Sequence, residues 1–106
     1  MSHDVVNEAE SGLQRAYAAA GGKKAFPWAT ILQAIMALFG GCTAKRAQRF
    51  AKIFPEAFKA MVVDKLKEDE LASASEAKLI AEVARAMFIK SKAGDIEVVA
   101  QHFNVS

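Results

Sequence analysis

Apolar residues recur at helical spacing along most of this chain, and they are densest between Pro27 and Gly40. Large apolar side chains recur there at i, i+3, i+4, i+7, i+8 and i+11, which predicts a helix over about 28–40. Alanines fill most of the remaining circumference. Because a helix that is apolar nearly all round is normally buried, we expect it at the centre of a bundle or where two copies meet. The residues expected in the core or at a self-association surface are Trp28, Ile31, Ile35 and Phe39.

Weaker amphipathic stripes flank this segment. The first predicts a helix over about 4–20, which should end at Gly21-Gly22 because glycine is common just beyond a helix C-terminus. The next predicts a helix over 44–54 with Thr43 as its N-cap. Its inner face would carry Ala44, Ala47, Phe50, Ala51 and Phe54.

A fourth helix is predicted from Pro55 to about residue 70. Proline either ends a helix or opens one at its first turn, and we favour the second role for Pro55. The inner stripe of this helix is expected to be formed by Phe58, Met61, Val62 and Leu66.

Two further helices complete the chain. The run from Ser73 to Glu76 has the pattern of a capping box, so a fifth helix should begin there and continue to about Lys92. Gly94 is expected to stop that helix, and Asp95 to cap a short last one.

Length and composition agree with this helical reading. The chain has 106 residues, of which 53% are apolar and 25% charged, and much of the apolar share is alanine. No segment shows strand periodicity. We therefore predict an all-α fold, with residues 1–106 as a single domain. The helices would form a compact bundle of five or six short helices around the hydrophobic helix at about 28–40.

The uncharged run at 25–42 is the one segment that raises the question of a membrane span. Its helical part would be only about 20 Å long, whereas the hydrocarbon core of a bilayer is about 30 Å thick. A buried helix is therefore the better interpretation. The N-terminus is acidic and polar, which argues against a signal peptide. The single cysteine, Cys42, excludes an intramolecular disulfide and fits a cytoplasmic setting.

Charge is distributed unevenly. The net charge is +2, yet residues 23–54 contain six bases and no acid. Clustered bases can neutralise phosphates and release counterions, which is the usual origin of sequence-independent nucleic-acid affinity. These bases could also be the solvent-exposed face of an amphipathic helix, or bind an acidic protein or anionic lipid. The candidate contact residues are Lys23, Lys24, Lys45, Arg46, Arg49 and Lys52.

Catalytic patterns are weak. His102 has no acid at i±3 or i±4, and no Ser or Cys is placed to complete a nucleophilic pair with it. Cys42, at a helix start, is better explained as a small buried thiol than as a reactive one. No cofactor, metal or small-molecule substrate is expected. Residues 96–106 resemble the first helix and turn of a helix-turn-helix motif. The second helix of that motif, the recognition helix that contacts the DNA bases, would have to begin at Ser106. A terminal amphipathic helix that closes the core explains the same residues.

The sequence thus favours a small non-catalytic binding module that acts through protein–protein interaction or self-association, with a homodimer as the expected state. The alternative is non-specific nucleic-acid binding through the basic region at 23–52.

Overall fold

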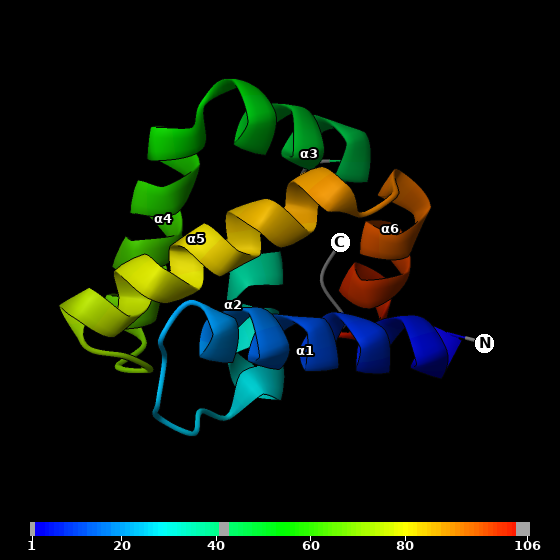
Figure 1. The fold of residues 1–106 in the computed structure, drawn as a ribbon. Helices are drawn as coiled ribbons and strands as arrows, with labels where there is room; N and C mark the ends of the chain where they lie inside the picture. The colour runs from blue at the N-terminus through cyan, green and yellow to red at the C-terminus, as the bar shows by residue number, and fades with distance from the viewer. Residues whose placement is uncertain (1, 41–42, 104–106) are drawn as a thin grey trace.

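Each amphipathic stripe forms a helix in the computed structural model, which describes residues 2–40 and 43–103 (Figure 1). Within these residues there are helices and the segments that connect them, with no strand, so the predicted all-α bundle of short helices is confirmed. No helix among them is both long and apolar enough to cross a membrane. The elements are α1 (Ser2–Ala19), α2 (Trp28–Ala37), α3 (Ala44–Ile53), α4 (Pro55–Glu68), α5 (Ala74–Lys90) and α6 (Ala93–His102).

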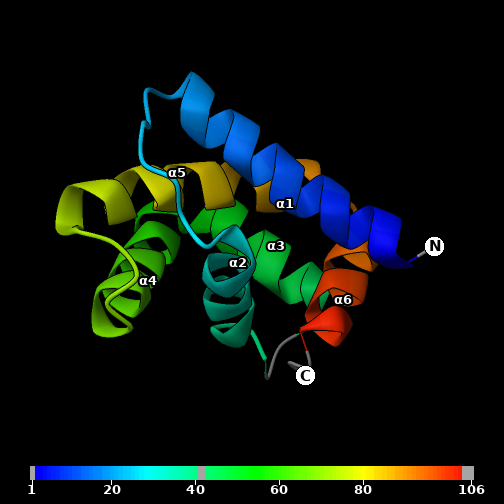
Figure 2. The same cartoon turned by 90° about the horizontal axis from the view of Figure 1, so that it is seen from below.

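Helix α5 organises the packing. It has its most extensive contact with α4 and also packs against α1 and α3, which lie on opposite sides of it (Figures 1 and 2). Its inner face contributes Ile80, Ala84 and Phe88, and these side chains have no exposed surface. At 17 residues α5 is long enough to contact α1, α3 and α4 along its length, whereas the more apolar α2 has only 10 residues.

Helix α2 is shorter than the sequence predicts. It ends at Ala37, and residues 38–40 form a tight turn of i→i−3 hydrogen bonds. This turn places the ring of Phe39 5.4 Å from that of Phe58 and 5.2 Å from that of Phe88. α2 packs against α1, α4 and α6, while a narrow strip opposite stays exposed. The exposed strip contains only small or polar residues: Ala29, Thr30, Gln33 and Ala37.

Several predicted helix ends are confirmed. The backbone N–H of Arg46 donates to Thr43 Oγ1 at 3.3 Å, so Thr43 caps α3. Ser73 and Glu76 form the predicted capping box at the start of α5. Pro55 occupies the first turn of α4, where its missing N–H costs nothing.

The predicted boundary at Gly94 is wrong. Ser91 and Lys92 adopt extended backbone angles, and α6 begins at Ala93 with Lys92 as its N-cap, so Gly94 and Asp95 lie in its first turn. The break is set by a residue distant in sequence, because the side-chain amide of Gln48 donates to the carbonyl oxygens of Phe88, at 3.1 Å, and Ser91. These are carbonyls that the end of a helix leaves without helical partners.

Two predicted core residues lie on the surface. Phe54 is 56% exposed because α3 ends at Ile53 and the backbone of Phe54 leaves the helical conformation. Met61 is 37% exposed, so the inner face of α4 is narrower than predicted and consists of Phe58, Val62 and Leu66.

Candidate functional site

The α3 face is the first candidate binding surface, and we define it as Lys45, Arg46, Arg49 and Lys52. All four side chains are exposed, and α3 contains no acidic residue. Among the ion pairs of residues 2–40 and 43–103, none includes a base of this face. The opposite side of α3 buries Ala47 and Ala51 against the core, which fixes the outward direction of the bases.

Lys23 and Lys24 do not belong to the same surface. Lys24 lies 3.7 Å from Glu76 at the start of α5, whereas Gln48 anchors α3 to the other end of α5. At 1.5 Å per residue these two anchor points are about 20 Å apart. Hydrogen bonds from the Ser73 side chain and backbone, together with Lys24, hold the pKa of Glu76 below its usual value. Lys24 also lies over the ring of Phe26, 5.3 Å from its centroid.

Two large apolar side chains extend the α3 face at the corner between α3 and α4. Ile53 is 57% exposed and Phe54 is 56% exposed. The ring of Phe54 lies 5.7 Å from that of half-buried Phe50, which supports it from one side. The surface therefore combines cationic groups with an accessible aromatic ring, which periodicity alone had assigned to the interior.

The residues expected in the core or at a self-association surface are mostly internal. Trp28 is 7% exposed, and Ile31 and Ile35 are fully buried. Phe39 is half-buried in the cluster with Phe58 and Phe88. A second copy could reach Trp28, Ile31 and Ile35 only if the bundle opened.

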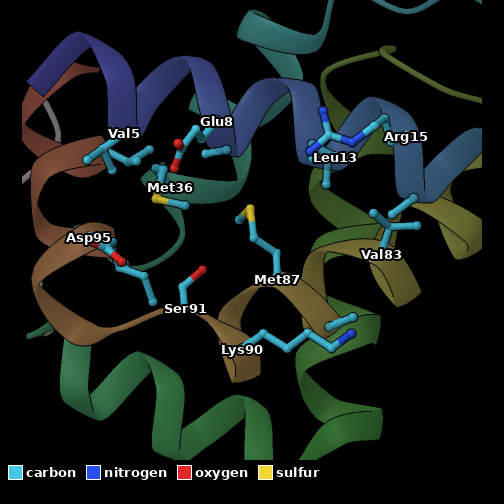
Figure 3. A pocket seen from close by; sticks show the side chains of 16 residues that line it. Val5, Glu8, Leu13, Arg15, Met36, Val83, Met87, Lys90, Ser91 and Asp95 are labelled. Carbon is cyan, nitrogen blue, oxygen red and sulfur yellow. The ribbon is translucent and has the colours of Figure 1, made fainter.

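A groove between α1 and the α5–α6 pair is the second candidate surface (Figure 3). Its volume is about 690 Å³, within the range of ligand-binding clefts. Small residues on α1, namely Ala9, Gly12 and Ala16, leave the space between the helices unfilled, and the floor is apolar. The floor includes Leu13, Met36, Val83, Met87, Ile96 and Val99.

Opposite charges mark the two ends of this groove. Glu8 and Asp95 lie toward one end, and Arg15 and Lys90 toward the other (Figure 3). In the described part of the chain, none of these four groups takes part in an ion pair. Sequence periodicity does not reveal this site, because the groove forms only when three helices pack. The spacing of the small residues on α1 was its one visible signal.

The residues considered for catalysis do not form an active-site arrangement in the described part of the chain. His102 is exposed, with its ring 5.1 Å from that of Phe103, and Cys42 lies outside the described residues. The described residues contain no group of three or more histidines, cysteines or acids that could hold a metal. Comparison of the chain with protein-family models, curated proteins and solved structures finds no match.

Proposed function

We propose that this protein is a non-catalytic binding module and that its α3 face binds single-stranded nucleic acid without sequence preference. The observation that supports this most directly is the set of four exposed bases on α3 that no described carboxylate neutralises. Such bases gain affinity from every phosphate they meet, since each contact releases a condensed counterion.

The exposed ring of Phe54 favours a single strand over a duplex. Proteins that hold single strands combine a basic surface with aromatic rings on which bases stack. Phe54 lies just beyond Lys52 and has more than half of its surface free. By contrast, the α3 face offers few hydrogen-bonding side chains besides its lysines and arginines, so we do not expect it to recognise particular nucleobases.

Self-association through the α3 face is the less favoured alternative. In a two-fold dimer the same surface patch would meet itself, so Lys45, Arg49 and Lys52 would approach like charges. An acidic partner avoids this repulsion. The expected homodimer therefore stays a prediction, to be tested by the molecular mass in solution.

The test measures binding of a fluorescently labelled oligothymidine by anisotropy as a function of salt. Four phosphate contacts predict a slope of log K against log salt of about −3, or about 50-fold weaker binding between 50 and 200 mM. The double variant Arg49→Glu, Lys52→Glu should bind at least tenfold more weakly, with a shallower slope. The control Lys67→Glu, Lys78→Glu changes the net charge equally at exposed sites outside α3.

Phe54 is tested separately. Phe54→Ala should weaken binding by about fivefold or more, because stacking contributes about 1–3 kcal/mol per base. Ile89→Ala removes another exposed apolar side chain, outside α3, and should have no effect. Equal losses in the α3 and control charge variants, or binding to anionic vesicles in place of the oligonucleotide, would contradict the proposal.

A further inference from the structure

We infer that the groove between α1 and the α5–α6 pair is a second binding site, and that it receives an amphipathic helix of a partner protein. Its occupant is distinct from any nucleic acid on α3, because α1 and α3 lie on opposite sides of α5 (Figure 1). An amphipathic helix in an apolar groove is a recurrent mode of peptide recognition, in which residues at i, i+4 and i+7 act as anchors.

The dimensions of the groove fit a helical segment. Its α1 wall runs from Val5 to Ala16, which corresponds to about 16 Å or three helical turns. Met36 and Met87 both reach into it, and flexible thioether side chains can adapt their shape to an incoming apolar face (Figure 3). Because Gly12 and Ala16 present almost no side chain, the backbone of an added helix can approach α1 closely.

The charges at the rim select the chemistry and the direction of this helix. Arg15 and Lys90 at one end attract acids, and Glu8 and Asp95 at the other attract bases. A ligand with a single charged head group satisfies one end only, whereas a helix with acids at one end and bases at the other satisfies both. Helices are most stable with acids in the first turn and bases in the last. The partner helix should therefore run antiparallel to α1, with its acidic first turn beside Arg15 and Lys90.

Synthetic helical peptides of about 16 residues test this inference, since such a helix is about 24 Å long and covers the groove of about 16 Å with its charged end turns at the rim. They share one leucine face and differ in their flanking charges: acids first and bases last, acids at both ends, or bases at both ends. We expect the first to bind tightest, by about five- to tenfold, because it forms rim pairs at both ends. Binding is measured by peptide fluorescence anisotropy.

Variants of the protein make the test specific. Gly12→Leu places a side chain in the groove and should abolish binding, whereas Gly12→Ala adds only a methyl group where the nearest side-chain atom is 4.0 Å away. The double variant Arg15→Glu, Lys90→Glu makes the whole rim acidic and should transfer the preference to the peptide with bases at both ends. Lys67→Glu, Lys78→Glu is again the control of equal net charge, and it should leave the preference unchanged.

Three results would overturn the inference. One is the absence of binding by the peptide with acids first, at concentrations up to about 100 µM. Another is equal binding to the Gly12→Leu and Gly12→Ala proteins. The third is a groove that binds a fatty acid but none of the peptides, since that outcome would assign it to a small amphiphile. Each can be separated from the outcome on α3, because the oligonucleotide assay uses different residues and a different probe.

Discussion

Glu70 occupies a backbone conformation that suits glycine, and this leads to a sharp prediction about stability. Among the described residues it is the only non-glycine with positive φ, at 55°. Glu70 follows the C-terminus of α4. There the N–H of Leu71 donates to the carbonyl oxygen of Leu66 at 2.9 Å, and the N–H of Glu70 donates to the carbonyl oxygen of Lys67 at 3.1 Å. These two bonds define a Schellman motif.

The end of α1 contains the same motif with glycine in the equivalent position. Gly21 has φ of 98°, and Gly22 donates to the carbonyl oxygen of Tyr17 at 2.9 Å. A side chain in the left-handed conformation costs about 1–2 kcal/mol, whereas glycine loses about 0.5–1 kcal/mol more backbone entropy on folding. Glu70→Gly should therefore raise the free energy of unfolding by about 0.5–1 kcal/mol. For a chain of this length that corresponds to a melting temperature about 2–5 °C higher.

Urea denaturation followed by far-ultraviolet circular dichroism measures this change. Glu70→Gln separates the effect of charge, since removal of a carboxylate from a helix C-terminus should contribute only about 0.3 kcal/mol. Glu68→Gly makes the same chemical change in the last turn of α4 and should destabilise the protein by up to about 1 kcal/mol. If Glu70→Gly gains no more than Glu70→Gln, the argument from backbone conformation is refuted.

Two further substitutions test the packing and the capping described above. Gly22→Ala should lower the free energy of unfolding by about 1–3 kcal/mol, because the added Cβ would lie 2.1 Å from Cε1 of Tyr17, whose ring is held by Phe26 and Trp28. Gly12→Ala, measured by the same denaturation, should instead stabilise the protein by up to about 1 kcal/mol. Ser73→Ala removes the capping box and should cost about 1 kcal/mol at neutral pH. Because the pKa of Glu76 is lowered in the folded state, its carboxylate stabilises the fold above the ordinary carboxyl range, and this contribution is lost as the pH falls through the folded-state pKa. The difference in unfolding free energy between wild type and Ser73→Ala should therefore narrow below about pH 4. A difference that stays constant down to about pH 3 would contradict the role given to Glu76.

Local sequence patterns were sufficient for most of the helical layout. The spacing of apolar residues, the Gly21-Gly22 stop, Pro55 and the Ser73–Glu76 box each act within about one helical turn, so they can be interpreted without knowledge of the fold. The same holds for the basic side of α3, whose opposite face is marked by Ala47 and Ala51.

Features that depend on distant residues were not predictable in this way. The break before α6 relies on Gln48, which is 43 positions from Ser91. α2 ends early, and the turn at 38–40 that follows it brings Phe39 onto Phe58 and Phe88. The groove requires small residues on α1 to face α5 and α6, and nothing in α1 alone indicates that a third helix will complete it.

Both proposed surfaces depend on α5, and this determines how variants should be interpreted. Ser91, just beyond α5, lines the groove with its side chain, while its carbonyl oxygen accepts the hydrogen bond from Gln48 of α3. The α3 face and the groove are therefore held in a fixed relation, and loss of buried α5 residues such as Phe88 should impair both. Substitutions at Arg49 or Gly12 change one surface each without removing a core contact. Only such surface variants can show whether the protein has one binding partner or two.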